Sequence, residues 1–271
     1  MAAKNLIFIF ILLLGLEGRA QKALFEWGGF IGHGNTADYP ASNEYRLRTL
    51  PVPYVRYRGN ILRSDEQEGT RFRMFSKDNF DLDFSFGGSF PTEGDKNQAR
   101  LYMPNLDWTL EIGPRLLYYF YRSPAAKFRL GLPLRMSYST DFTTWREVGS
   151  VFAPTLQLDL NNVGTENLNF YLMTDFNYYS EGLADYFFEV APQYQITGRS
   201  AYNAVGGYIG YNVGLAAKYD IGHANFILGS RYSDYSESVN RASDLHKTPV
   251  NWTYFIGFGW MFYQSEEREE F

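Results

Sequence analysis

Apolar and polar residues alternate along much of this chain, in runs longer than the ~5–6 residues usual for a strand of a globular sheet. In the segment 79–90 one face carries Phe80, Leu82, Phe84 and Phe86, and the other carries Asp81, Asp83 and Ser85. Segments 106–121, 128–138 and 251–263 repeat this pattern. Because successive side chains of a strand point to opposite faces, each segment predicts a strand with one apolar and one polar side.

The length of these segments favours a membrane barrel over a soluble sandwich. About 9–11 tilted residues of a strand cross a bilayer, and aromatic residues stand at both ends of the apolar face of 251–263, as in the girdles of outer-membrane barrels. We therefore predict an all-β fold, a single antiparallel transmembrane β-barrel of about 12 strands (10–12). The expected strands are 23–34, 49–58, 60–64, 70–76, 79–90, 105–121, 125–138, 149–160, 167–178, 205–219, 223–234 and 251–263.

Long and short connections alternate between these strands. The long ones are 35–48, 65–69, 91–104, 139–148, 179–204 and 235–250. Outer-membrane barrels have short periplasmic turns and longer external loops, so we expect both termini in the periplasm. Segment 184–196 alternates poorly and contains Pro192, which predicts an external loop there.

The first residues predict export. Lys4, the apolar stretch 6–16 and the small residues around Arg19 have the layout of a signal peptide, with cleavage expected after Ala20. The barrel is expected over 21–263 and an acidic tail over 264–271, in the cell outer membrane with lipid as its surroundings. The net charge of −5 gives no basic footprint for nucleic acid, and without Cys no thiolate-ligated metal site is available.

No pattern in the sequence indicates catalysis or a cofactor. His33, His223 and His246 fall in or beside different connections, which argues against one site, and a Ser243–His246 pair is a weak signal. We therefore predict a non-enzymatic protein with no cofactor and no metal.

Charged residues on the polar faces predict a charged lumen. The candidate lumen-lining residues are Arg56, Arg58, Arg71, Arg73, Asp81, Asp83, Glu111, Arg115, Arg129 and Arg135. Confined charges seek partners, so the four arginines 56, 58, 71 and 73 are expected to pair with Asp81, Asp83 and Glu111. Two interpretations stay open: a plug of mutually neutralised charge, or an Arg-lined pore that favours anions.

The stretch 28–59 resembles the entry segment of the MipA/OmpV family of outer-membrane proteins. The matching residues are Tyr39, Pro40, Ser42, Tyr45, Arg46, Pro51, Pro53, Tyr54, Arg58 and Gly59, with weaker echoes at 184–187, 198–207 and 257–263. Pro51 and Pro53 are expected near a rim, where a strand begins, because proline lacks the N–H that a ladder needs.

The resemblance implies a non-enzymatic barrel that serves as a scaffold for murein-remodelling enzymes. The implied partners are a periplasmic murein lytic transglycosylase or a murein synthase. The alternative is a narrow outer-membrane channel for small polar or anionic solutes. The resemblance implies no catalytic residues, and no chemical role for the matching residues.

Overall fold

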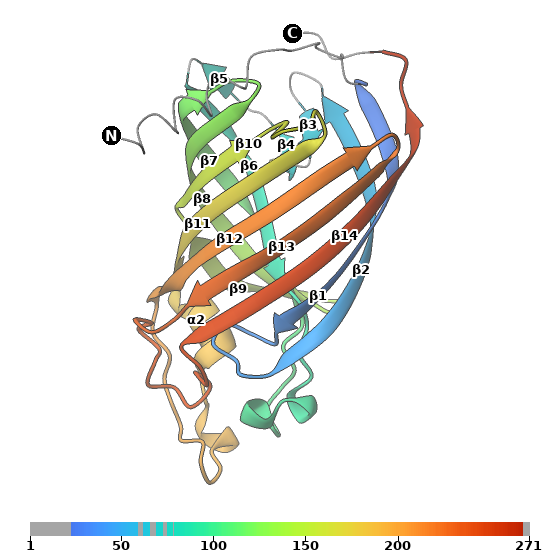
Figure 1. Ribbon diagram of the computed structural model, residues 1–271. Helices are drawn as coiled ribbons and strands as arrows, with labels where there is room; N and C mark the ends of the chain where they lie inside the picture. The colour runs from blue at the N-terminus through green and yellow to red at the C-terminus, as the bar shows by residue number, and fades with distance from the viewer. Residues whose placement is uncertain (1–22, 59–61, 66–68, 73–74, 78, 268–271) are drawn as a thin grey trace, which may run out of the picture.

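The computed structural model describes residues 23–58, 62–65, 69–72, 75–77 and 79–267. These residues form one antiparallel sheet that curves into a barrel (Figure 1). Its strands are β1 (Phe25–Ala37), β2 (Tyr45–Arg58), β3 (Leu62–Asp65), β4 (Gly69–Phe72), β5 (Phe75–Lys77), β6 (Phe80–Ser89), β7 (Trp108–Arg122), β8 (Ala126–Thr140), β9 (Trp145–Phe152), β10 (Thr155–Leu160), β11 (Leu168–Tyr179), β12 (Gly207–Ile221), β13 (Ala224–Asp234) and β14 (Val250–Gln264). The predicted antiparallel barrel is confirmed.

Strands that follow one another in the chain are mostly hydrogen-bonded neighbours in the barrel wall. The hydrogen-bonded order runs β4-β3-β2-β1-β14-β13-β12-β11-β10-β8-β7-β6-β5, and β9 lies between β8 and β11 at the far end of β10. The first and last long strands, β1 and β14, pair from Glu26↔Gln264 to Asn35↔Tyr254. This pairing closes the wall between the two ends of the described chain.

The alternation of the sequence sorts side chains between the two surfaces. The outward residues of β14 are large and exposed, among them Trp252, Ile256 and Phe262. The inward residues of β6 are the nearly buried Asp81 and Asp83. The barrel therefore has an apolar outer surface and a polar interior, the reverse of a soluble protein.

The two ends of the barrel differ in their connections (Figure 1). One end, here called the long-loop end, carries residues 38–44, 90–107, 141–144, 180–206 and 235–249. The other, the turn end, carries the short connections 123–125, 161–167 and 222–223, and both described ends of the chain lie there. Within the described ranges no helix is long and apolar enough to cross a membrane.

Several elements differ from the expected boundaries. The expected strand 149–160 is interrupted at Ala153 and Pro154, and the described residues of 70–76 belong to two strands, β4 and β5. The described part of the chain therefore contains fourteen strands. Strand β2 begins at Tyr45 rather than at 49. Pro51 and Pro53 therefore lie in the middle of a strand and not at its start, which corrects the rim placement.

The connection 180–206 is more ordered than a simple loop. It contains helix α2 (Glu181–Phe188) and the short 3₁₀ helix η3 (Pro192–Tyr194). The connection 90–107 likewise contains two 3₁₀ turns, η1 (Gly94–Lys96) and η2 (Gln98–Arg100). These segments fold against the long-loop end of the barrel, where they build the cap described below (Figure 1).

Candidate functional site: a charged lumen beneath a folded cap

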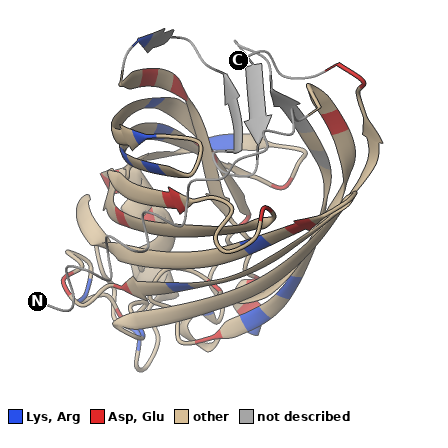
Figure 2. Ribbon diagram, turned by 45° about the horizontal axis from the view of Figure 1, so that its top comes forward, with Lys and Arg blue, Asp and Glu red and all other residues tan. Residues whose placement is uncertain are grey.

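Ion pairs between neighbouring strands line the interior of the barrel. Asp83 of β6 stands opposite Arg115 of β7 and accepts two hydrogen bonds from its guanidinium, at 2.9 and 2.8 Å. One strand further, Glu111 of β7 accepts from Nε of Arg135 on β8 at 2.9 Å. Figure 2 shows acidic and basic positions on neighbouring strands of the wall. The strand register thus places opposite charges within reach of one another.

The same pattern continues around the wall. Nη1 of Arg129 on β8 lies 2.7 Å from Oδ2 of Asp159 on β10. Asp81 of β6, at 1 % exposure, lies 3.4 Å from Arg122 at the end of β7. Within the single strand β12, Lys218 lies 2.7 Å from Asp220. Much of the lumen charge is therefore neutralised locally within the wall.

The lumen holds a cavity of about 900 Å³. Its basic lining consists of Arg115, Arg129, Arg135, Lys218 and Arg231, and its acidic lining of Asp38, Glu111 and Asp175. In two of the ion pairs the base is more exposed than the acid: 17 % against 1 % for Arg115–Asp83, and 44 % against 10 % for Arg231–Asp175. In Lys218–Asp220 the order is reversed, at 4 % against 32 %. Among the described residues, five basic and three acidic side chains line the cavity, which is a formal excess of positive charge.

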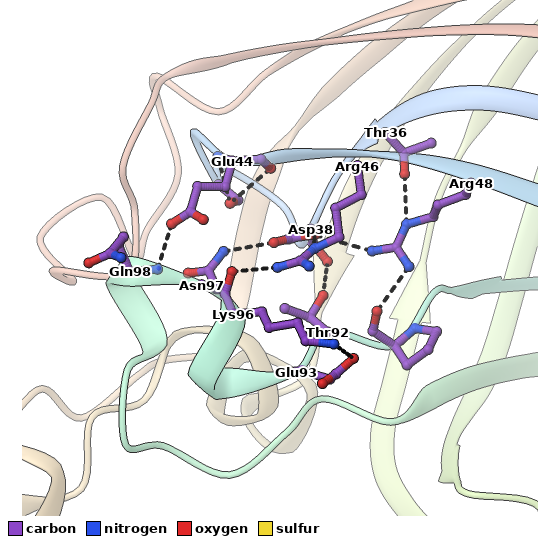
Figure 3. A network of polar contacts seen from close by, with 12 residues as sticks. Thr36, Asp38, Glu44, Arg46, Arg48, Thr92, Glu93, Lys96, Asn97 and Gln98 are labelled. Carbon is purple, nitrogen blue, oxygen red and sulfur yellow. Dashed lines mark hydrogen bonds and ion pairs between the residues drawn. The ribbon is translucent and has the colours of Figure 1, made fainter.

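A polar network around Asp38 lies at the long-loop end of this cavity (Figure 3). The side chain of Asp38 is 0 % exposed and accepts from Arg46 Nε at 2.7 Å, from Arg48 Nη2 at 3.2 Å and from Asn97 at 2.9 Å. Its backbone carbonyl accepts from the hydroxyl of Thr92 at 2.7 Å. One buried carboxylate thereby joins β2 to the connection 90–107.

A second set of hydrogen bonds at the long-loop end involves residues of the stretch that resembles the family. Tyr39, 2 % exposed, donates its hydroxyl to the carbonyl of Leu245 at 2.9 Å. Asn251 at the start of β14 accepts from the N–H of Ala41 at 3.0 Å and donates to the carbonyl of Ser42 at 2.7 Å. The connection 38–44 is thus fixed to the connection 235–249 and to the first residues of β14.

An apolar core fills the space between these two sets of hydrogen bonds. It is a cluster of buried side chains from four of the five long connections, all but 141–144, and from nearby strand ends: Tyr39, Ala41, Ala99, Met103, Leu106, Val148, Val151, Ala153, Leu183, Ala184, Phe187, Phe188, Val190, Ala204, Ile209 and Leu245. Helix α2 contributes Leu183 at 1 % and Phe188 at 0 % exposure. We call the connections and this core together the cap.

Two buried arginines hold the cap by its backbone carbonyls. Arg199 donates from Nη1 to the carbonyls of Ala99 and Leu101, each at 2.9 Å, and from Nη2 to that of Tyr194 at 2.6 Å. Arg100 donates to the carbonyl of Phe187 at 3.3 Å, and burial lowers the pKa of Arg100 to about 10. Both guanidinium groups therefore join the connection 90–107 to 180–206.

The structure places the predicted site residues in three groups. Glu111, Arg115, Arg129 and Arg135 line the cavity, and Asp81 and Asp83 are buried beside it. Tyr39, Pro40, Ser42, Tyr45 and Arg46 lie in or beside the cap, and Pro51 and Pro53 lie in β2. The side chains of Tyr54, Arg56, Arg58 and Arg71, together with Arg73 and Gly59, lie outside the described residues, as does the expected signal peptide.

Sequence reasoning gave no role to five residues that organise the cap, although one of them, Arg199, lies in the weaker family echo at 198–207: Asp38, Arg48, Asn251, Arg199 and Arg100. Their partners are mostly backbone carbonyls or residues far along the chain, so no local pattern marks them. The described partners of Asp81, Asp83 and Glu111 are Arg122, Arg115 and Arg135, each on the adjacent strand.

The histidines lie apart, in β1, in the 222–223 turn and in the connection 235–249. Nδ1 of His33 lies 2.8 Å from the hydroxyl oxygen of Thr49. The ring of His223 stacks on that of Trp260, with 6.1 Å between the ring centres. No group of three or more His, Asp or Glu side chains in the described ranges could hold a metal ion.

A barrel with an apolar outer surface and an ion-paired interior belongs to the class of outer-membrane β-barrel proteins. The family described as MltA-interacting protein MipA matches residues 29–262, and the chain belongs to this family. The family resemblance of the sequence is thereby confirmed.

Solved structures with similar folds are also outer-membrane and transport proteins. An outer-membrane channel from Pseudomonas putida F1 has 11 % identity and a TM-score of 0.46, and the match covers 92 % of this chain and 98 % of that one. The outer-membrane protein OprG from Pseudomonas aeruginosa has 15 % identity, a TM-score of 0.29, and coverage of 90 % and 97 %. The toluene transporter TbuX from Ralstonia pickettii has 10 % identity, a TM-score of 0.31, and coverage of 90 % of both chains. No curated protein matches the chain in sequence.

Proposed function

We propose that this protein is a non-enzymatic interaction protein of the outer membrane, a capped barrel that serves as a scaffold for murein-remodelling enzymes. The observation that carries the proposal is the cap. Its core residues Leu183, Phe188, Ile209 and Leu245 are at most 1 % exposed, so folded chain occupies the mouth of the barrel. A capped barrel suits a protein whose function lies in its surface.

The turn end is the surface that would meet these enzymes. Short turns are characteristic of the periplasmic side of outer-membrane barrels, which supports an orientation with 123–125, 161–167 and 222–223 in the periplasm, next to the murein layer. The family description as an MltA-interacting protein supports a murein lytic transglycosylase as the partner, with a murein synthase as a second partner of the same assembly.

A narrow channel for small polar or anionic solutes is the alternative function. The cavity of about 900 Å³ favours it, because its lining exposes more basic than acidic groups. Rings of Arg or Lys select anions. In this alternative the cap would have to leave a path for solute.

Two measurements on one preparation separate these functions. Purified protein in nanodiscs is titrated with a purified murein lytic transglycosylase, and the same protein is inserted in planar bilayers. The scaffold predicts saturable binding and no stepwise conductance, whereas the channel predicts anion-selective steps and no binding.

Two charge reversals at opposite ends locate the binding surface. Glu166→Lys changes an exposed residue of the turn 161–167, and Glu237→Lys changes an exposed residue of the cap. The scaffold expects the first variant to bind more weakly and the second to bind as the wild type does. A loss of binding only with Glu237→Lys would contradict the proposed orientation.

A further inference from the structure

The guanidinium of Arg231, on β13, makes no hydrogen bond to any residue of the described chain. Its ion pair with Asp175 of β11 is loose, with 3.9 Å between Nη2 and Oδ1, and its side chain is 44 % exposed in the lining of the lumen cavity. Arg115 and Arg135, by contrast, donate to their carboxylates at 2.9 Å. Because a hydrogen bond joins heavy atoms about 2.7–3.2 Å apart, the donors of Arg231 stay available to a ligand.

Asp175 obtains its hydrogen bonds from two amide side chains instead. Its Oδ2 accepts from Nδ2 of Asn177 at 2.9 Å and from Nδ2 of Asn212 at 2.5 Å. Both bonds reach the same oxygen, so no described residue donates to Oδ1, the oxygen that faces Arg231. Each carboxylate oxygen can accept further hydrogen bonds. A free acceptor and a guanidinium with free donors therefore lie side by side in the cavity.

The strand register explains why these two groups approach without forming a hydrogen bond. On the lumen face, Asn212 of β12 lies between Asp175 and Ser233, and Gly214 is the next lumen-facing residue of β12 toward the turn end. Gly214 pairs with Arg231. Arg231 and Asp175 are therefore diagonal to one another across β12. The arginine side chain has to cross this strand to approach the acid, and it crosses at a glycine.

Gly214 keeps the wall beside the guanidinium free of side chains. A Cβ at Gly214 would meet only Cε of Met173 and the backbone oxygen of Ser230, each at 3.9 Å, which is ordinary van der Waals contact. The φ angle of Gly214 is not positive, so the backbone does not require glycine here. The missing side chain instead leaves space for a ligand beside Arg231.

The cavity continues on both sides of Arg231. It extends to Tyr39 and Phe187 under the cap and, in the other direction, to Lys218 near the turn end of β12. Thr253, which is paired with Arg231 on β14, adds a neutral hydroxyl group to the same lining. A solute that enters from the turn end therefore reaches Arg231 before it reaches the cap.

The two free groups define the chemistry of a matching ligand. Arg231 needs an anionic acceptor, and the planar guanidinium suits a carboxylate, which can accept two parallel hydrogen bonds from it. Oδ1 of Asp175 needs a donor. Because these groups lie 3.9 Å apart, the acceptor and the donor of the ligand have to be close neighbours, as they are on adjacent carbon atoms. Asp175 repels any second negative charge on the ligand, which disfavours dianions.

We propose that Arg231 and Asp175 form a binding site in the lumen for a small carboxylate with a hydroxyl or ammonium group on the carbon next to the carboxylate. The carboxylate accepts from the guanidinium, and the hydroxyl or ammonium group donates to Oδ1 of Asp175. The rest of the solute extends along the cavity, whose volume of about 900 Å³ is within the ~300–1,000 Å³ usual for small-ligand sites. This inference goes beyond the proposed scaffold role, and it concerns binding rather than conduction.

Four solutes of similar size test the two contacts. Lactate and alanine have both required groups, propionate lacks the donor, and alaninamide lacks the carboxylate. Saturation-transfer difference NMR on the protein in nanodiscs, with empty nanodiscs as the blank, gives the dissociation constant of each solute.

Lactate or alanine should bind at least about tenfold more tightly than propionate and alaninamide, because each of these two forfeits a hydrogen bond to a charged group. Tighter binding of lactate than of alanine would assign the hydroxyl as the donor, and the reverse would assign the ammonium group. No saturable binding of lactate or alanine would overturn the proposal. Propionate binding as tightly as both would overturn the contact with Asp175, and alaninamide doing so would overturn the contact with Arg231.

Two substitutions at Arg231 and Gly214 test the position of the site. Arg231→Gln should weaken binding of the tighter solute about tenfold or more, because it removes the charged donor. Gly214→Leu leaves both charges in place, fills the space beside the guanidinium and should weaken binding as well. The matched control Arg241→Gln removes an exposed arginine of the cap and should bind as the wild type does. Heat-modifiable gel mobility identifies folded variants, and wild-type affinity in a folded Arg231→Gln or Gly214→Leu would contradict the site.

Asp175→Asn separates the two contacts from one another. It should reduce the preference for the tighter solute over propionate to within about twofold, while propionate itself binds no more weakly, because a negative charge near its carboxylate is removed. An equal loss of affinity for both solutes would show a merely structural role for Asp175. Binding of the murein lytic transglycosylase should be unchanged in Asp175→Asn and Arg231→Gln, so a failure of the solute site is distinguishable from a failure of the scaffold role.

Discussion

Arg129 and Asp159 form an ion pair at 2.7 Å in which the side chains are 2 % and 0 % exposed. They come from β8 and β10, whose ladder places Gln157 opposite Arg129 and Asp159 opposite Lys127. Gln157 donates to the second carboxylate oxygen at 2.9 Å. This arrangement satisfies both oxygens of a carboxylate that has no access to water.

Removing this carboxylate should destabilise the barrel strongly. Asp159→Ala leaves the buried guanidinium of Arg129 without its acid, and breaking a buried pair costs about 3–5 kcal/mol. Urea unfolding of the protein in detergent measures the loss. Glu93→Ala is the control, since Glu93 and Lys96 are also 2.7 Å apart but each 59 % exposed. An exposed pair contributes about 0–1 kcal/mol, so similar losses in both variants would contradict this ranking.

Arg199→Ala should loosen the cap while the barrel stays folded. The substitution removes hydrogen bonds to the carbonyls of Ala99, Leu101 and Tyr194, and each bond from a charged donor contributes about 1.5–3 kcal/mol. Limited proteolysis should cleave the connections 90–107 and 180–206 faster, without a change in the gel mobility of unheated protein. Arg241→Ala, which removes an exposed cap arginine, should leave the cleavage rate unchanged.

Gly28→Ala should impair closure of the barrel between β1 and β14. The register of this pair shifts between Trp27 and Gly28, and a Cβ at Gly28 would lie 1.9 Å from the backbone oxygen of Trp260. The strands would have to separate, at a cost of about 1–3 kcal/mol. Gly29→Ala is the matched control, because its Cβ would meet the Phe262 ring at an ordinary 3.6 Å. Refolding yield in detergent should fall only for Gly28→Ala.

Arginine should be tolerated in the lumen and not on the outer surface. Leu228 of β13 is 61 % exposed on the apolar face, and Leu228→Arg should cost about 2–4 kcal/mol if it lies near the bilayer midplane. Met173→Arg adds the same charge to the lining of the cavity and should assemble in near-normal yield. Heat-modifiable mobility of the membrane-inserted protein measures assembly, and a reversed order would show that the two faces are misassigned.

The stability of the cap should depend on pH in opposite ways at Asp185 and Asp141. Burial, with repulsion from Glu189 and Glu181, raises the pKa of Asp185 in α2. An acid whose pKa is raised holds its proton more tightly in the folded state than in the unfolded state. Ionisation of Asp185 therefore destabilises the cap as pH rises through the folded-state pKa. Asp185→Asn should slow amide exchange in α2 at pH 8, and this gain should vanish as pH falls.

At Asp141 the dependence of cap stability on pH should run in the opposite direction. Hydrogen bonds from Thr144 and Thr143 hold the pKa of Asp141 well below its usual range. The ionised carboxylate of Asp141 therefore stabilises the folded loop. This stabilisation is present above the unfolded-state pKa and is lost as pH falls through the folded-state pKa. Asp141→Asn should therefore speed exchange in residues 141–144 at pH 8. Changes of the same sign in both variants would contradict the two shifts.

The sequence by itself determined that strands build the wall of this protein and which face of each strand is apolar. Alternation of side chains is a local property of a strand, so the pattern at 79–90 or 251–263 is enough to assign an apolar and a polar face. Loop length is local as well, and it separated the long-loop end from the turn end. The matching residues from Tyr39 to Tyr45 supported the family before any contact was known.

The tertiary structure decided which charges meet and how the connections of the long-loop end pack together. Asp83 pairs with Arg115 and Glu111 with Arg135 because strand register, which no single strand encodes, brings them opposite or diagonal to one another. The cap depends on contacts such as Tyr39 with Leu245, more than two hundred residues apart in the chain. Pro51 and Pro53 were visible in the sequence, but their place in the middle of β2 was not. A missing N–H matters only on the side where a neighbouring strand would lie, and that side is defined by the folded barrel.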